Sequence, residues 1–273
     1  MLKYLSSLLI ITLCGIPCFA QRDVSHLKGK LFFYWGWNTD QFSKSDLHFK
    51  GPDHDFTLNQ VIAEDRPTHF SIDAYFNPGN LSTPQYNYRM GYYLNDHFSI
   101  SLGMDHMKYV MVQDQVVSIN GYIKLGSVYD GNYKNQAIQL KPDFLKFEHT
   151  NGLNYANIEF RRLDDLIQIN HLKIKLNSGI GAGVLIPRTD ATLLNKAEYD
   201  EFHLAGYGIA PSLGINFTFF NSFFIQTEYK AGYLNLPDIR TTINLADKAS
   251  QHFWFGQLNL VFGTTIGTRK KDR

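Results

Sequence analysis

Two short segments place a histidine and a serine where nucleophilic catalysis would need them. The triplets are His69-Phe70-Ser71 and His97-Phe98-Ser99. Residues two positions apart on a β-strand point to the same face, so each imidazole would lie beside a hydroxyl that it can activate as a base. The chain has ten histidines, however, and such triplets arise by chance. Catalysis is therefore one alternative for this chain, and we assign no catalytic residue.

A second segment is rich in groups that bind metals. It contains Asp46, His48, Asp53, His54, Asp55, Glu64 and Asp65. Carboxylates and imidazoles are ligands for calcium and zinc. Their spacing here matches no established site, so we interpret the segment as a solvated acidic loop and expect no metal and no cofactor.

Eight further charged residues lie in runs where polar and apolar side chains alternate. They are Arg89, Asp105, Glu159, Arg161, Lys173, Lys175, Glu228 and Lys230. If these charges share a narrow lumen, opposite charges should pair across strands, because a buried charge without a partner is costly. Arg161 with Glu159, and Lys230 with Glu228, are same-strand neighbours that face the same way. We call the eight residues the predicted lumen charge network.

The alternation that positions these charges has the period of a β-strand. In residues 172–186, for example, Ile174 and Ile180 share one side, whereas Lys173 and Lys175 share the other. A period of two predicts strands at 30–38, 85–94, 98–105, 155–162, 172–186, 204–219, 223–234 and 252–266. Short turns, such as 95–97 and 220–222, alternate with long segments at 39–84, 112–153, 188–203 and 235–251.

The first twenty residues have a different character. Lys3 precedes a short apolar run that ends in the small residues Cys18 and Ala20. This pattern predicts a cleaved signal peptide over 1–20, which leaves 21–273 as a single domain. Both cysteines, Cys14 and Cys18, lie in the signal, so we expect no disulfide in the mature chain.

The composition narrows the class of partner. Without Lys3, the remaining 25 basic residues balance the 25 acidic residues. This balance argues against nucleic-acid binding, which requires a basic surface.

Aromatic residues favour a membrane barrel over a soluble sandwich. They make up 15% of the chain, against 19% charged residues, and gather at the ends of the predicted strands. The residues concerned are Trp35, Trp37, Tyr86, Tyr92, Phe217, Phe219, Phe223, Tyr233 and Trp254. Aromatic girdles of this kind mark the two interfaces of a bilayer. In lipid, strands must pair all their backbone groups, which requires a closed barrel.

This rhythm of strands over residues 30–268 resembles the small eight-stranded outer-membrane β-barrel proteins of Gram-negative bacteria. The resemblance implies an all-β fold: a closed antiparallel transmembrane β-barrel with long external loops and short periplasmic turns. The two longest loops, 39–84 and 112–153, have room for strands above the membrane or for a further hairpin, so ten strands are the alternative. It also implies a porin-like protein of the cell outer membrane, surrounded by lipid and lipopolysaccharide. The sequence departs from that family after Phe262, the last aromatic residue, where GTTIGTRKKDR follows.

A row of glycines shares the side of the charges. It comprises Gly179, Gly181, Gly183, Gly206, Gly208 and Gly214. Glycine weakens a strand unless another group approaches it closely. We expect rings from the opposite wall, Phe32, Tyr34, Phe253 and Phe255, to lean into this lumen glycine patch; a cavity for an apolar ligand is the alternative.

These features predict a structural or surface-interaction role with a polar lumen filled by side chains. A narrow small-solute channel remains one alternative. A lipid-A-modifying enzyme, of the acyl hydrolase type that some barrels of this size resemble, is another. Binding of an extracellular ligand by the long loops is also left open.

Overall fold

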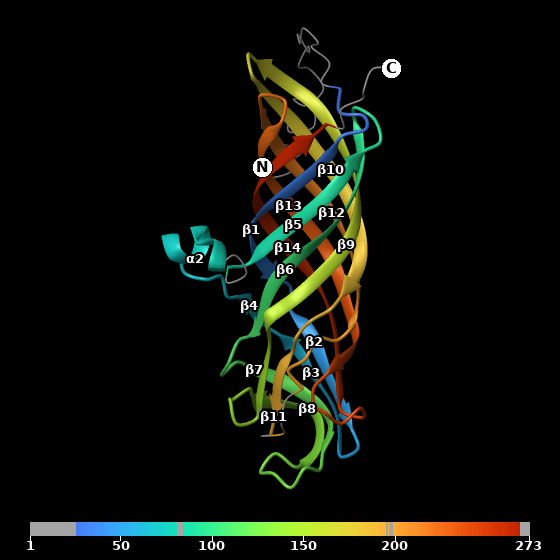
Figure 1. Ribbon diagram of the computed structural model, residues 1–273. Helices are drawn as coiled ribbons and strands as arrows, with labels where there is room; N and C mark the ends of the chain where they lie inside the picture. Colours follow the sequence, from blue (N-terminus) through green and yellow to red (C-terminus); the bar gives the residue numbers. More distant parts are fainter. Residues whose placement is uncertain (1–25, 81–83, 195, 197–198, 268–273) are drawn as a thin grey trace, which may run out of the picture.

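The computed structural model describes residues 26–80, 84–194, 196 and 199–267 (Figure 1). The predicted signal peptide, 1–20, lies outside the described residues. Almost all regular structure in the described part is β. The exceptions are a short helix, α2 (Ile72–Phe76), and a 3-10 turn, η1 (Pro78–Asn80). None of the helices described has the length and apolar character to cross a membrane.

Eight antiparallel strands, which we call the wall strands, overlap the eight segments predicted from alternation. They are β1 (Leu31–Phe42), β5 (Tyr86–Tyr93), β6 (Phe98–Met111), β9 (Leu145–Ile169), β10 (Leu172–Leu185), β12 (Gly206–Phe219), β13 (Phe223–Arg240) and β14 (Lys248–Ile266). Each pairs with the next in this order. β14 also pairs with β1, from Leu31 opposite Ile266 to Phe42 opposite Phe255. Figure 1 shows these strands running obliquely around a common axis.

A second group of strands forms what we call the extension, at one end of the wall (Figure 1). It contains β2 (Ser45–Gly51), β3 (His54–Val61), β4 (Ala63–Asp65), β7 (Val116–Ile123), β8 (Gly131–Gln139) and β11 (Asp190–Leu193), together with the adjoining ends of β9, β13 and β14. β2 pairs with β14, and the sheet then continues through β3 and β7 to β8. The short turns after β5, β9 and β12 lie at the other end.

The extension corrects the expectation of long loops. Strands occupy much of residues 39–84, 112–153 and 235–251, as the sequence left open for the first two, and the short β11 lies within 188–203. The expected acidic loop is in large part the hairpin of β2 and β3. Leu47 and Phe49 face its buried side, whereas Asp46 and Lys50 are exposed. The alternation is therefore present, but in runs too short for the sequence analysis to separate from a loop.

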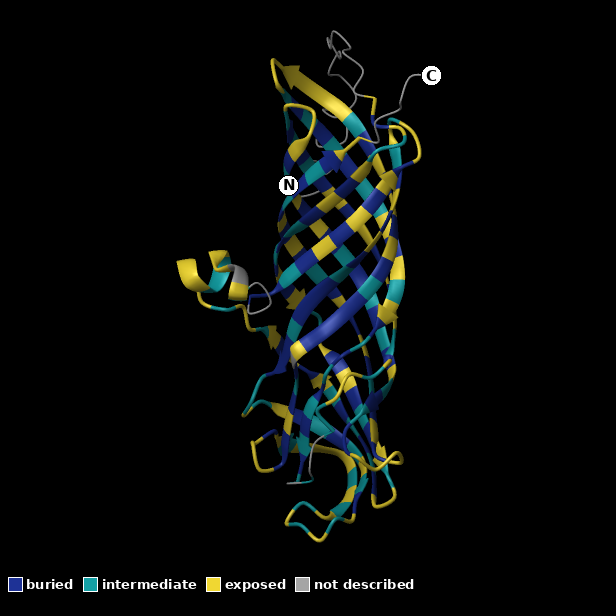
Figure 2. Cartoon of the chain, in the orientation of Figure 1, coloured by how far each residue is buried: buried dark blue, intermediate teal, exposed yellow. Residues whose placement is uncertain are grey.

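The two faces of the sheet exchange polarity along single strands. In the wall part of β14, Gln257 and Asn259 are buried, whereas Leu258 and Leu260 are exposed. Toward the extension, the buried positions become apolar, as at Phe253, and the exposed ones become polar, as at His252. In Figure 2, exposed and buried residues alternate over the part of the wall nearer the short turns. The buried face thus carries charges and amides in the middle of the wall, whereas it is mainly apolar in the extension.

The interior of the extension is a packed apolar core. Phe49, Phe56, Phe147 and Leu236 are at most 1% exposed. Burial lowers the pKa of the His149 imidazole to about 3. The ring is therefore neutral at physiological pH, and it is hydrogen-bonded to the Thr189 hydroxyl (3.0 Å) and the Gln251 amide (3.2 Å). An extension with such a core can hold its shape without contact with a membrane.

Candidate functional site

Six of the eight predicted lumen charges meet inside the wall. They come from four strands: Arg89 on β5, Asp105 on β6, Glu159 and Arg161 on β9, and Glu228 and Lys230 on β13. Each is at most 3% exposed. Because alternate residues of a strand point to opposite faces, the position of each charge in the pattern places it on the inner face. We call these six residues the charge network.

Ion pairs connect the whole charge network. The Arg89 guanidinium lies 2.8 Å from Glu159 and 3.9 Å from Asp105. The Lys230 ammonium lies 2.7 Å from Asp105 and 2.9 Å from Glu159. Arg161 pairs with both Glu159 and Glu228, and its Nη2 lies 3.0 Å from Glu228 Oε1. Three cations therefore face three carboxylates, so the network is neutral as a whole.

Neutral polar groups satisfy much of the remaining hydrogen-bonding capacity. Arg89 Nε donates to the Tyr34 hydroxyl at 2.9 Å, and Arg89 Nη2 donates to Asn157 Oδ1 at 2.8 Å. The Gln226 amide donates to Glu228 at 3.0 Å. A buried ion pair is favourable only when such additional bonds offset the loss of water. The bonds with Tyr34, Asn157 and Gln226 are additional hydrogen bonds of this kind.

The two same-strand pairs of opposite charge noted in the sequence behave differently. Arg161 pairs with Glu159, whereas the salt bridges of Lys230 go across strands to Asp105 and Glu159 rather than to Glu228. Residues two apart on a strand are separated by roughly 6–7 Å along it, so a side chain that extends across the bore can reach another strand instead. Lys173 and Lys175 are buried but stand apart from the six, and Lys175 pairs with Asp165 at 3.3 Å.

The predicted glycine patch faces charged side chains rather than rings. Gly179 lies opposite Arg161, and Gly181 lies opposite Glu159. A Cβ at Gly179 would lie 2.8 Å from Arg161 Cγ, and one at Gly181 would lie 2.6 Å from Glu159 Cγ. These glycines leave the space that the stems of Arg161 and Glu159 occupy.

The other patch glycines also abut neighbouring strands. Gly214 lies against Glu228, Gly183 against Asn157 and Gly206 against the Asn235 carbonyl. Among the three atoms nearest to each of these glycines, a ring atom occurs at Gly208 alone, from Tyr155. The expectation that Phe32, Tyr34, Phe253 and Phe255 fill the patch is therefore wrong. Ring-to-glycine contacts occur elsewhere: Phe32 covers Gly91, and Phe255 covers Gly232.

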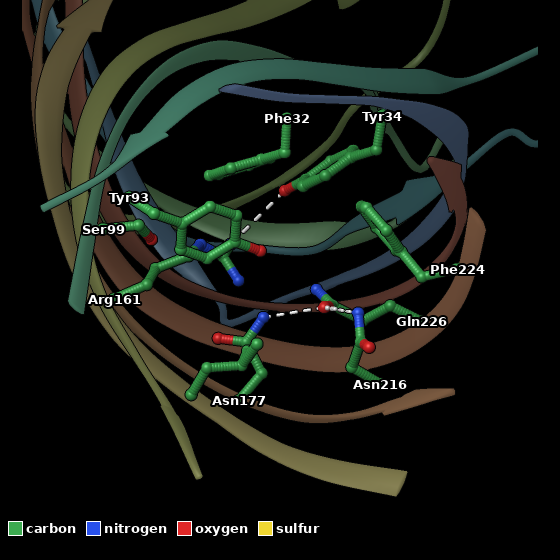
Figure 3. Close-up of a pocket in the computed structure, with 10 residues that line it drawn as sticks. Phe32, Tyr34, Tyr93, Ser99, Arg161, Asn177, Asn216, Phe224 and Gln226 are labelled. Carbon is green, nitrogen blue, oxygen red and sulfur yellow. Dashed lines mark hydrogen bonds between the residues drawn. The ribbon is translucent and has the colours of Figure 1, made fainter. Parts of the chain in front are cut away.

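Toward the short turns, the bore ends in a small pocket (Figure 3). Its lining is Phe32, Tyr34, Tyr93, Ser99, Arg161, Leu163, Asn177, Asn216, Phe224 and Gln226. Figure 3 shows the Arg161 side chain bonded to the Tyr34 hydroxyl, and the amides of Asn177 and Asn216 both bonded to Gln226. The cavity is about 10 Å³, which is near the minimum for one water molecule.

Where the wall meets the extension, the bore ends against aromatic rings that belong to the core of the extension. Phe42, Tyr109, Phe147 and Phe253 form what we call the aromatic plug. The ring centroids of Tyr109 and Phe253 are 5.0 Å apart, and those of Phe42 and Tyr109 are 5.1 Å apart. Phe147 meets Tyr109 edge-on at 6.4 Å. The charge network thus lies in the middle of the bore, and the packed rings lie at the end next to the extension.

Sequence analysis missed one inward polar group. Asp40 is 5% exposed, and its carboxylate accepts bonds from the amides of Gln85 (2.9 Å) and Gln257 (3.0 Å). Asp40 lies beyond the predicted end of the first strand, 30–38, and so was assigned to a loop. Continuing the alternation of Phe32, Tyr34 and Asn38 by one step would have placed it inside.

The groups first considered for catalysis and metal binding have other partners. His97 Nδ1 lies 3.2 Å from the Leu163 carbonyl, while Ser99 is buried in the bore. The Ser71 hydroxyl caps α2 by accepting a bond from the Ala74 N–H. In the acidic segment, His48 pairs with Asp55 at 2.8 Å. Within the described ranges, no three His, Cys, Asp or Glu side chains are grouped to hold a metal ion.

No protein family matches the sequence, and no curated protein matches it. Several solved structures are similar. The outer-membrane protein AlkL, solved in lipid bilayers, covers 95% of this chain and 100% of its own, with a TM-score of 0.43 and 8% identity.

Two further similar structures are outer-membrane proteins. OprG from Pseudomonas aeruginosa covers 90% of this chain and 100% of its own, with a TM-score of 0.41 and 10% identity. Ail, the attachment invasion locus protein of Yersinia pestis, covers 86% of this chain and 99% of its own, with a TM-score of 0.30 and 10% identity. These similar structures are small outer-membrane β-barrel proteins.

Replacing Arg161 by methionine should destabilise the fold strongly. The change leaves Glu159 and Glu228 without their shared cation, and breaking a buried pair in this way costs about 3–5 kcal/mol. Urea unfolding of the purified protein in lipid vesicles measures the free energy. The matched control is Arg162→Met on the next, outward position, where the side chain is 55% exposed, pairs with Asp164 and lies over the Phe98 ring. Equal unfolding free energies for the two variants would show that the network does not hold the fold.

Proposed function

We propose that this is an outer-membrane protein whose eight wall strands close into a transmembrane β-barrel. Its bore is filled by side chains, and the extension stands at the cell surface as a rigid platform for interaction with other molecules. The observation that carries the proposal is the exchange of polarity between the wall and the extension. Apolar outward side chains recur from strand to strand over the wall, which suits hydrocarbon around the wall and water around the extension.

The outward face of the wall is too apolar to suit water. Leu102 is 63% exposed, Leu213 57% and Trp254 64%, and similar residues recur on neighbouring wall strands. A soluble protein seldom exposes so wide an apolar surface. In a bilayer, the same surface is favourable, and the pairing of β14 with β1 leaves no unpaired strand edge toward lipid.

The two ends of the wall differ in a way that suggests its orientation. Barrels of the outer membrane have short turns on the periplasmic side and longer structures outside. The short turns here follow β5, β9 and β12, and the first residues of β1 and the last of β14 pair at that same end. We therefore place the short turns in the periplasm and the extension outside the cell.

The extension has the properties of an interaction surface. Its core is apolar and packed, so its polar outer face is held in one shape. β8 is the last strand of the sheet, and in the described part of the chain it pairs only with β7. Its outer edge therefore offers backbone groups to a strand of a partner. A structural or surface-interaction role accounts for these features.

The filled bore favours this role over a channel. The charge network and the aromatic plug occupy successive levels, and the pocket at the other end is about 10 Å³. An interior of this kind resembles the plugged lumen of small eight-stranded barrels rather than an aqueous pore. The bonds already made by His97 and Ser71 likewise give no support to lipid-modifying catalysis.

Cysteine labelling on intact cells tests the orientation. Both natural cysteines precede residue 21, so a single cysteine introduced after the predicted signal peptide would be the one labelled site of the mature chain. A membrane-impermeant maleimide should label Val128→Cys, at the tip of the β7–β8 hairpin, without permeabilisation. It should label Ser222→Cys, in a short turn, only after the outer membrane is opened. The reverse pattern, or equal labelling of both, would refute the proposed placement.

Recording in planar bilayers tests the filled bore. The wild-type protein should give no steady ionic current, because no continuous aqueous path crosses the charge network and the aromatic plug. Truncation of one ring in Tyr109→Ala should leave the protein non-conducting, since the charge network still closes the bore. A stable conductance of the wild-type protein that scales with salt concentration would show that the protein is a channel rather than a sealed barrel.

A further inference from the structure

A side arm leaves the wall between β4 and β5. We define the arm as residues 66–80, which include α2 and η1. Figure 1 shows α2 standing out to the side of the wall, beside β1 and β6, rather than over the extension. The chain thus interrupts the wall to place a short helix away from the barrel axis, and no residue of α2 is buried.

The arm exposes large apolar side chains with no covering element. Phe70 is 73% exposed, Ile72 76% and Phe76 59%. Ile72 and Phe76 are four residues apart, so they share one face of the helix turn. The neighbouring side of the helix turn is polar. There, the Asp73 carboxylate accepts hydrogen bonds from the side-chain amides of Asn77 (2.7 Å) and Asn80 (2.9 Å). The arm is therefore amphipathic.

Internal contacts give the arm a defined shape. The Ser71 hydroxyl accepts the Ala74 N–H at 3.1 Å, and the Tyr75 hydroxyl donates to the Thr68 carbonyl at 2.7 Å. Phe70 packs on Tyr75 at 5.3 Å between ring centroids. The apolar side chains are thus presented by an ordered turn.

The position of the arm is set by Trp37. The Trp37 ring lies 5.5 Å from Tyr75 and 5.4 Å from Phe76. On its other sides it meets Trp35 and Phe262, which are outward residues of the wall. Trp37 is also the last apolar outward residue of β1, because the next outward positions are Thr39 and Gln41. The arm therefore joins the wall at the height where its outer face turns polar.

We propose that the arm is an interfacial lipid anchor, which inserts Phe70, Ile72 and Phe76 into the outer leaflet at the boundary between headgroups and hydrocarbon. The proposal rests on the proposed function, which supplies the bilayer. Lipid is the occupant that fits, because the apolar face of the arm continues the apolar face of the wall through Trp37. Amphipathic helices that lie in the interface bury aromatic and aliphatic residues in this way and leave polar groups among the headgroups.

Quenching of a fluorophore by brominated lipids tests the anchor. The full-length protein, in vesicles of brominated phosphatidylcholine, carries bimane on a single cysteine. Ile72→Cys should be quenched, most strongly by bromine near the headgroup end of the acyl chain. Leu213→Cys on the wall is the positive control, and Val128→Cys in the extension is the unquenched control. Adding Phe70→Ser and Phe76→Ser to Ile72→Cys should reduce its quenching toward the Val128→Cys value, whereas adding Val116→Ser in the extension should not.

The controls separate the anchor from the function on which it rests. If Leu213→Cys is quenched and Ile72→Cys is not, the barrel stands and the anchor is refuted. The same conclusion follows if Ile72→Cys crosslinks between copies while bromine does not quench it, because the apolar face then binds a second copy. If Leu213→Cys escapes quenching, the transmembrane barrel fails, and the anchor fails with it.

Discussion

The proposed function depends on one constraint, which is that the surroundings of the sheet change part of the way along its strands. Over the wall, outward positions are apolar and inward positions carry charges and amides. Over the extension, the assignment is reversed. A strand in a uniform solvent has no reason to exchange its faces, because one side would always be the core. The reversal is expected when hydrocarbon surrounds one part of the barrel and water surrounds the other.

The charge network follows from this constraint. In the proposed eight-stranded barrel, side chains that cannot face hydrocarbon fill a bore that is only just wide enough for them. Three cations and three carboxylates offset one another there, and Tyr34, Asn157 and Gln226 bond to them. Glycines opposite Arg161 and Glu159 provide the room for their stems. Small and charged residues on the inner face therefore form one packed unit.

The wall strands could be predicted from the sequence because their outward positions are apolar and many of their inward positions are polar. Lys173 beside Ile174 is an example. The extension could not, because its strands are short and Asp46 and His48 resemble the residues of a solvated loop. The individual partners in each ion pair could not be predicted from the sequence either. Lys230 and Asp105 are 125 residues apart, and their contact depends on the stagger of the strands around the axis. The occupant of the glycine patch depends equally on register, which sets Gly179 against Arg161.

The most direct test of the constraint is a scan of spin labels along the outward face of β14 in bilayers. Labels are placed at Leu260, Leu258, His252 and Ser250, and collisions with oxygen and with a water-soluble nickel complex are compared. The account predicts that Leu260 and Leu258 favour oxygen, that His252 and Ser250 favour nickel, and that the change occurs around Trp254. Equal access of nickel to all four positions would contradict it, because the wall would then stand in water along its whole length.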